Sequence, residues 1–285
     1  MNLRQYLLPL YRALRPVVDG LKLNAVARPV WAALWRSRDH SLIRARQNGR
    51  VWWLEPDVAL GGEHYEPATV AWLRSAIQPG MTVIDVGANV GQLSLEMAHL
   101  VGTRGRVVSI EPSPGNLKYL RAHLSANGFD ERVSVVEAAC SASEGELVLE
   151  VAGGDLSSIE NGPQLAGIGL KPNPIDSDRP RKQVNVRTLS LDSLCRDRKL
   201  AVDVLKVDVE GAELEVFRGA AECLRRYKPR IIFGFHPFAF ADPEAARAEL
   251  EQLFARAGLR VENARPGVPW ALGEFTVAPF DPASR

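Results

Sequence analysis

The stretch VIDVGANVG, residues 83–91, runs from an apolar strand through an aspartate into a loop with few large side chains. Glycines at positions 87 and 91 allow a sharp turn and a close approach of the backbone to a ligand. The residues from about position 90 predict a helix, whose first amide groups have no partner within the helix. A strand, a bare loop and a helix in this order predict a ligand-binding turn of an α/β domain.

Apolar strands alternate with amphipathic helices from this stretch onward. Strands are expected at residues 82–87, 106–112, 132–140, 203–211, 230–235, 259–264 and 271–279. Helices are expected at residues 67–77, 90–100, 114–128, 213–227 and 243–258. This alternation predicts a three-layer, doubly wound α/β domain around a mostly parallel, seven-stranded sheet.

The first 50 residues differ from the rest in charge. They hold ten basic and two acidic side chains, so they carry +8 in a chain whose net charge is +1. Apolar residues from Leu3 to Leu21 recur every three or four positions, which predicts an amphipathic helix. We therefore expect a basic helical extension over residues 1–60, with a short strand at VWWLEP (residues 51–56), and the main domain over residues 61–285.

Residues 1–50 have two interpretations. The helices pack on the main domain with solvated arginines, or they lie on an anionic membrane surface. The first forty residues show neither a transmembrane run of about 20 apolar residues nor a signal peptide. Three widely spaced cysteines at positions 140, 195 and 223 indicate a reducing compartment and buried thiols. We expect a cytoplasmic protein, at most peripheral at the membrane, and no nucleic-acid partner.

A long insert interrupts the second half of the chain at residues 153–182. It is rich in glycine and proline, and strand-like segments flank it on both sides. Connections of this length within a compact domain are usually functional or disordered. The insert is interpreted as a substrate loop or lid, with a disordered surface loop as the alternative.

The loop after the first sheet strand distinguishes between nucleotide ligands. A dinucleotide site would need G-x-G-x-x-G, but the corresponding positions are Gly87, Asn89 and Gln92. Asp85, at the end of the strand, suits an ammonium or sulfonium group better than a phosphate. Glu111 ends the next strand, where a carboxylate can accept both hydroxyls of a ribose. The pattern thus favours a nucleoside that carries a positive charge.

Charged residues also converge at the end of the strand over residues 203–211. Lys206, Asp208 and Glu210 should share one face of this strand, with the acids as partners of the lysine. This set is either a structural ion pair or an acidic site for the reaction. His236 ends the following strand and is either a general base or a packed histidine. Asp208 and Glu210 offer the oxygen ligands that suit a divalent metal such as magnesium, but two carboxylates are weak evidence, so no metal is assigned.

The run from Glu63 to His236 resembles the FkbM family of S-adenosylmethionine-dependent methyltransferases, which are class I, Rossmann-like enzymes mostly assigned to O-methylation. The matching segments include VIDVGANVGQLS from residue 83, VVSIEPSPGNLKYLRAHLSAN from residue 107 and DVLKVDVEGAELEVFRGA from residue 203. The last segment is the most specific to the family. One departure is Gly234, where the family usually has an acid two residues before the histidine.

The resemblance implies S-adenosyl-L-methionine as the cofactor and S-adenosyl-L-homocysteine as the product. It places the methionine part at Asp85, Gly87, Asn89 and Gly91, the ribose at Glu111, and the adenine between Glu137 and Ala138. For the reaction, Asp208 and His236 are the candidate bases, and Lys206 and Glu210 would orient the reactants.

The predicted activity is methyl transfer to a hydroxyl of a sugar, of a glycolipid or polysaccharide precursor, or of a polyketide-like compound. Two alternatives remain open: an NAD-dependent oxidoreductase on a Rossmann-like domain, and a nucleoside-binding protein without turnover.

Overall fold

The computed structural model describes residues 42–152, 164–166, 181–263, 270 and 273–280. The chain divides into two compact units, residues 1–67 and residues 68–285. The basic helices expected within residues 1–41 and most of the insert at residues 153–182 lie outside the described residues. In the described ranges, no helix combines the length and the apolar character that a membrane span requires.

The described part of the first unit is a β-hairpin followed by a short helix. Strands β1 (Ile43–Gln47) and β2 (Arg50–Leu54) pair antiparallel, and α3 (Pro56–Leu60) follows. Asn48 and Gly49 have φ angles of 49° and 82°, which a two-residue hairpin turn requires. The prediction of a helical extension is therefore wrong for residues 43–50, whereas the short strand expected from residue 51 is confirmed as part of β2. Buried and exposed side chains alternate there with the period of a strand.

The second unit is built on the predicted seven-stranded sheet, whose strand order is β12-β13-β11-β10-β3-β4-β5. Its strands are β3 (Thr82–Val86), β4 (Arg106–Glu111), β5 (Val133–Glu137), β10 (Val204–Val207), β11 (Arg230–Phe235), β12 (Leu259–Val261) and β13 (Gly273–Pro279). The first five of these strands are parallel to one another, and β13 runs antiparallel to both of its neighbours. The predicted fold class is confirmed.

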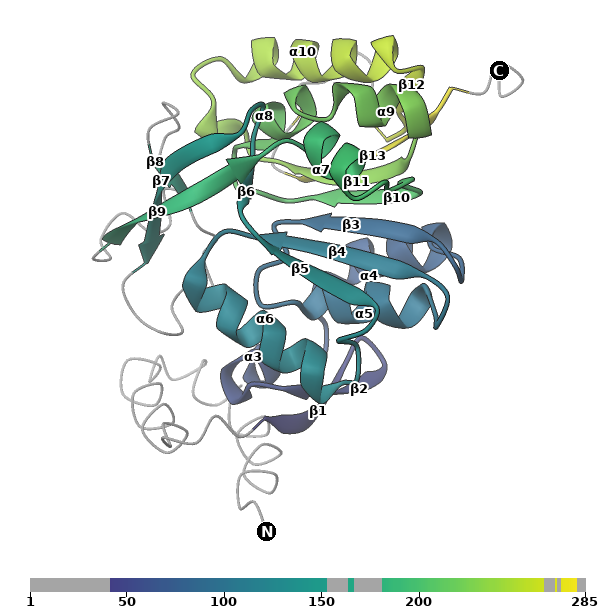
Figure 1. Ribbon diagram of the computed structural model, residues 1–285, viewed down its shortest axis with the longest axis vertical. Coiled ribbons are helices and arrows are strands. Elements are labelled where there is room, and N and C mark those ends of the chain that lie inside the picture. Colours follow the sequence, from purple (N-terminus) through teal and green to yellow (C-terminus); the bar gives the residue numbers. More distant parts are fainter. Residues whose placement is uncertain (1–41, 153–163, 167–180, 264–269, 271–272, 281–285) are drawn as a thin grey trace, which may run out of the picture. The chain divides into compact units, whose positions relative to one another are not determined.

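Helices cover both faces of this sheet, as Figure 1 shows. The helices are α4 (Pro67–Ala76), α5 (Gln92–Leu100), α6 (Pro114–Ala126), α7 (Leu191–Asp197), α8 (Glu213–Arg218), α9 (Ala221–Tyr227) and α10 (Pro243–Arg256), with a 3-10 turn η3 (Pro237–Ala239). Helix α5 packs against β3 and β4, and α6 packs against β5, whereas α8 packs against β11 and α10 packs against α8 and β12. The helix predicted over residues 213–227 is two helices. A β-carbon at Gly219, which separates them, would lie 2.1 Å from the carbonyl oxygen of Ser141.

The chain changes direction between β3 and β10. From β3 it proceeds outward to β4 and β5, and it then returns to β10 on the other side of β3 before continuing to β11. Such a reversal opens a crevice beyond the carboxyl ends of the two central strands, where ligands bind in doubly wound sheets. The glycine loop (residues 87–91) follows β3 and the acidic turn (residues 208–211) follows β10, so both border this crevice.

A smaller sheet with the strand order β6-β9-β7-β8 adjoins the main one. Its strands are β6 (Ala139–Cys140), β7 (Gly145–Ala152), β8 (Gln164–Ala166) and β9 (Arg181–Leu189). The strand predicted over residues 132–140 breaks at Ala138, because the chain leaves β4 there and pairs with β9 instead. The two strand-like segments that flank the insert are β7 and β9, which pair antiparallel.

The core fixes the central strands firmly. All four residues of β10 are buried, and Phe233 of β11 makes an edge-to-face contact with Phe217, at 5.3 Å between ring centroids. Phe254 of α10 contacts the Phe217 ring in the same way at 4.9 Å. As expected, all three cysteines are buried free thiols. This packing holds the carboxyl ends of β10 and β11 on a rigid base.

Candidate active site

The glycine loop after β3 touches the chain that follows β10. Gly87 has a φ of 75°, and a β-carbon there would lie only 1.9 Å from the carbonyl oxygen of Asp208. Gly91 has a φ of 89°, and a β-carbon there would lie 2.5 Å from Cδ1 of Leu120. Both glycines are needed for conformation and for space. The loop predicted from VIDVGANVG is thus packed directly against the predicted acidic site.

Asp85 and Lys206 hold the base of this loop. Their strands pair so that the two residues lie opposite each other, and Lys206 Nζ lies 3.2 Å from Asp85 Oδ1. Asp85 is 0% exposed, and its Oδ2 accepts a hydrogen bond from Ser94 at 2.6 Å. Lys206 Nζ also donates to the carbonyl oxygen of Gly87 at 2.8 Å. The structure pairs Lys206 with Asp85, a partner that the sequence analysis did not name, and the pair supports the loop from below.

Glu111 anchors the other side of the loop. The carboxylate accepts hydrogen bonds from the amide of Asn89 at 2.9 Å, the amide of Ser113 at 2.9 Å and Nδ2 of Asn116 at 3.1 Å. Burial raises the pKa of Glu111, and these hydrogen bonds oppose the rise. A carboxylate has about four acceptor positions, so three are used within the protein. Glu111 therefore supports the loop through its backbone and keeps one acceptor position on Oε2, and its predicted contact with the ribose hydroxyls stays a prediction.

Two buried acceptors near Glu111 remain without a hydrogen-bond partner among the described residues. They are Oδ1 of Asn89 and Oδ1 of Asn116. A buried polar atom is costly unless it is paired, so these oxygens need a donor. Hydroxyl and amino groups of a nucleoside supply such donors. The residues around the loop therefore fit the cofactor that the sequence predicts, and Asn116 is a site residue that the sequence analysis missed.

Glu137 and Ala138 do not form a comparable pocket. The side chain of Glu137 is 59% exposed and forms an ion pair with Arg121 of α6, whereas Ala138 is fully buried where the chain changes sheets. Glu137 lies beside Glu111 in the strand register. Its geometry is that of an exposed acid at a strand end, and its predicted contact with adenine stays a prediction.

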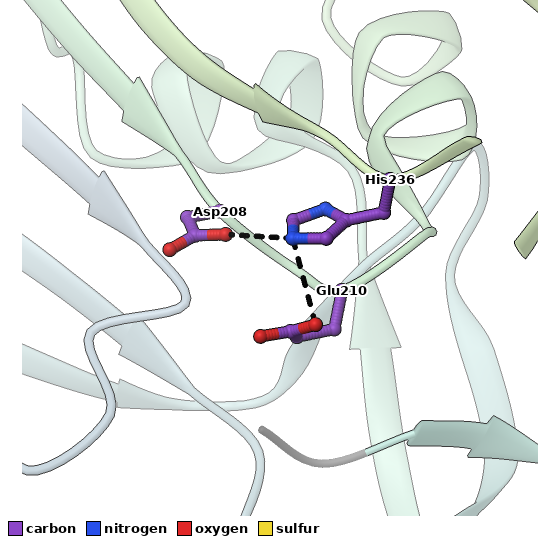
Figure 2. A group of neighbouring side chains, drawn as sticks. All are labelled: Asp208, Glu210 and His236. Carbon is purple, nitrogen blue, oxygen red and sulfur yellow. Dashed lines mark ion pairs between the residues drawn. The ribbon is translucent and has the colours of Figure 1, made fainter. Parts of the chain in front are cut away.

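Asp208 and Glu210 of the acidic turn after β10 lie beside His236, which follows β11 (Figure 2). Nε2 of His236 lies 3.7 Å from Asp208 Oδ1 and 3.5 Å from Glu210 Oε2. On its other side, Nδ1 donates to Oε1 of Glu213 at 2.7 Å. Glu213 is fully buried in the first turn of α8. The sequence analysis missed this residue, although it stands three positions after Glu210 in the family-specific segment.

These carboxylates control the protonation of the imidazole. Burial alone would lower the pKa of His236, but the hydrogen bond to Glu213 and the charges of Glu213, Glu210 and Asp208 raise that pKa to about 9. Burial also raises the pKa of Glu210, against the effect of His236. A ring whose pKa is raised in this way carries a proton on both nitrogens at neutral pH, and the predicted role of His236 as a general base stays a prediction.

Gly234 provides the space in which Asp208 and His236 approach each other. A β-carbon at this position would lie 2.9 Å from Asp208 Oδ1 and 3.0 Å from His236 Cε1. Any side chain at position 234 would crowd both groups, so the glycine is what lets Asp208 and His236 approach this closely.

The fold and the site define the chain as a class I, S-adenosylmethionine-dependent methyltransferase. It belongs to the FkbM family, because the methyltransferase FkbM domain matches residues 85–261.

Among curated relatives, the methyltransferase sdnD of Sordaria araneosa is 26% identical over 222 residues, which cover 68% of this chain and 79% of sdnD. The ubiquinone/menaquinone biosynthesis C-methyltransferase UbiE of Shewanella frigidimarina is 39% identical over only 64 residues, 22% of this chain and 26% of UbiE. The match thus spans about a quarter of the length of UbiE.

Similar solved structures include the methyltransferase FkbM of Methylobacillus flagellatus KT, with 14% identity, a TM-score of 0.45, and coverage of 78% of this chain and 52% of that one. Another is Aeropyrum pernix fibrillarin with natively bound S-adenosyl-L-methionine, with 14% identity, a TM-score of 0.45, and coverage of 85% and 84%.

Proposed function

We propose that this methyltransferase transfers the methyl group to a hydroxyl oxygen of a sugar, of a glycolipid or polysaccharide precursor, or of a polyketide-like compound. The observation that carries the proposal is the contact between Gly87 and the carbonyl oxygen of Asp208. This contact supports the proposal because it brings the glycine loop against the backbone of Asp208, the residue whose carboxylate is the candidate proton acceptor. Proximity of this kind is a large part of catalysis when two reactants must meet in line.

The cofactor would be held by the loop and by the acceptors behind it. The backbone of residues 87–91, with Oδ1 of Asn89 and Oδ1 of Asn116, forms the binding surface. Glu111 and the Asp85–Lys206 pair keep this surface in shape. When bound, S-adenosylmethionine supplies an electrophilic methyl group on a sulfonium sulfur.

Asp208 is the candidate base for the acceptor hydroxyl. Its side chain is 34% exposed, so it is the most accessible carboxylate of the acidic turn. An alcohol is a weak nucleophile until its proton is removed, and a carboxylate within hydrogen-bond reach can take that proton. Glu210, at 27% side-chain exposure, can bind a further hydroxyl of the acceptor. Two carboxylates on one turn favour a polyhydroxylated acceptor.

Two measurements test this function on the full chain. Calorimetric titration with S-adenosyl-L-homocysteine should show binding of one molecule, and a radiolabelled methyl group should pass to members of a panel of sugars, sugar nucleotides and macrolide alcohols. The Asp208→Asn variant should lose turnover and keep its affinity for S-adenosyl-L-homocysteine. The variant Glu131→Gln, which changes an exposed acid, is the control. Product binding without transfer to any acceptor would instead support the non-catalytic alternative.

The membrane interpretation of residues 1–50 bears on the acceptor, because a lipid-linked glycan lies at the bilayer surface. Cosedimentation with vesicles separates the two interpretations. Binding to anionic vesicles that is lost at high salt supports an interfacial segment and a glycolipid acceptor. Equal recovery in the supernatant with anionic and neutral vesicles supports helices packed on the main domain.

A further inference from the structure

The Nε2 atom of His236 points at two carboxylates that it does not hydrogen-bond. The residue is 8% exposed, and its Nε2 makes no hydrogen bond to any described residue. Figure 2 shows Nε2 directed into the space between Asp208 and Glu210, which come from the turn after β10. A ring nitrogen that is paired with two carboxylates at 3.5 and 3.7 Å and hydrogen-bonds neither marks a position where a further atom would bind all three.

The other nitrogen of the ring is fixed from behind. Nδ1 donates to Glu213 at 2.7 Å, and the same oxygen of Glu213 accepts from the amide of Gly211 at 3.0 Å. In metal sites, a ligating histidine commonly donates its second ring N–H to a carboxylate, which sets the tautomer and the direction of the ligating nitrogen. Glu213 has that relation to His236, and it leaves Nε2 as the atom that faces the two acids.

The three side chains lie close enough together to converge on one ion. One ligand atom from each of Asp208, Glu210 and His236 lies within 4.8 Å of the other two. Ligand atoms at about 2.1 Å from a shared ion, at octahedral to tetrahedral angles, are about 3.0 to 3.4 Å apart. The observed separations from Nε2 are 3.7 Å and 3.5 Å, and the ligand atoms of the two carboxylates lie within 4.8 Å of each other. Closure around an ion therefore needs shifts of a few tenths of an ångström toward Nε2 and of up to about 1.4 Å between the two carboxylates.

We propose that Asp208, Glu210 and His236 bind one divalent transition-metal ion through Oδ1, Oε2 and Nε2. One imidazole with two carboxylates suits Mn²⁺ or Zn²⁺ better than Mg²⁺, which prefers oxygen ligands and retains its waters. A bound ion takes the place of the proton on Nε2. Three protein ligands leave coordination positions open for water or a ligand oxygen.

The role of the ion rests on the proposed methyl transfer, but its binding does not. An acceptor hydroxyl at an open coordination position would lose its proton more readily, as metal-bound water does. Since Oδ1 of Asp208 faces the ion, Oδ2 remains to take that proton. The acidic turn would then both hold and deprotonate the acceptor.

The direct test is a titration of the chelator-treated full chain with MnCl2, followed by the electron paramagnetic resonance signal of free Mn²⁺. We expect one ion per chain in the wild type and in the control Glu131→Gln. We expect at least tenfold weaker binding in Glu210→Gln, whose partly exposed side chain makes loss of folding a small risk. Glu213→Gln should weaken binding by about 10- to 100-fold, as expected for a residue that orients a ligand. No saturable binding, or equal affinity in Glu210→Gln and the wild type, would overturn the site.

A methyl-transfer assay separates this proposal from the proposed function. Transfer that falls at least tenfold on chelation and returns with Mn²⁺ supports both. Full transfer in the chelated protein keeps the methyltransferase and overturns the role of the ion. Stoichiometric Mn²⁺ binding without transfer to any acceptor supports the site and overturns the proposed function.

Discussion

Replacing Lys206 with methionine tests whether the buried ion pair under the glycine loop holds the fold together. Asp85 is 0% exposed, and its Oδ1 makes no hydrogen bond within the described residues, so the Lys206 charge at 3.2 Å offsets its burial. With an effective dielectric constant of about 20, two unit charges at this distance attract by about 5 kcal/mol. Removing one partner of such a pair costs about 3–5 kcal/mol.

The Lys206→Met variant should therefore lose about 3–5 kcal/mol of unfolding free energy. The total for a typical domain is roughly 5–15 kcal/mol, so this loss is a large part of it. Urea unfolding followed by tryptophan fluorescence measures this loss. The exposed Lys118 supplies a matched control, and Lys118→Met should stay within about 0.5 kcal/mol of the wild type.

A double-mutant cycle completes the test. Asp85→Asn in the Lys206→Met background removes the orphaned charge, so the double variant should be more stable than the sum of the single losses predicts, by at least about 2 kcal/mol. A Lys206→Met variant within about 1 kcal/mol of the wild type, or two losses that add to within about 0.5 kcal/mol, would show that the ion pair does not hold the fold together.

Three further predictions concern the loop and the acidic turn. Burial holds the pKa of His123 at about 4, below its ordinary 6.5, so the unfolded chain binds a proton that the folded protein does not. Stability should fall by about 3 kcal/mol as the pH drops from 6.5 to 4, and urea curves of His123→Gln at several pH values should lack that part of the slope. Glu111→Ala should weaken S-adenosyl-L-homocysteine binding by about 1.5–3 kcal/mol in calorimetry, because the Asn89 amide loses its acceptor; an unchanged affinity would show that Glu111 does not support the site. Gly234→Ala should displace the Asp208 side chain and slow turnover at least tenfold with product affinity unchanged, and full activity would contradict the packing described.

The sheet could be predicted because each of its strands and helices has a pattern within its own short segment of sequence. Each central strand is a short apolar run bounded by turn residues, and each helix has its own apolar face. The hairpin at residues 43–54 carried a local signal as well, since Asn48-Gly49 stands between two strand-like runs. The basic, amphipathic pattern of the first 50 residues instead favoured a prediction of helix. The break at Ala138 had no local signal, because it depends on which neighbouring strand the chain meets next.

The contacts inside the site were harder to predict for a different reason. Lys206 and Asp85 are 121 residues apart, and they meet only because β10 pairs with β3 in one register. A shift of one residue would have placed the lysine on the opposite face. Asn116 and Glu213 likewise face the strand ends because of how the first turns of α6 and α8 are rotated, which the sequence does not specify by itself.

Three side chains from distant parts of the chain support the glycine loop, so the loop could be predicted from the sequence but its supports could not. Lys206 donates to the carbonyl oxygen of Gly87, Glu111 accepts from the amide of Asn89, and His123 bonds the carbonyl oxygen of Val90. All three supports are buried, and all three bond the backbone of the loop. A change in any support should therefore lower stability and cofactor affinity together, since the binding surface is that backbone. Changes in the acidic turn should alter turnover alone, and this separation distinguishes residues that shape the loop from residues that act on the acceptor.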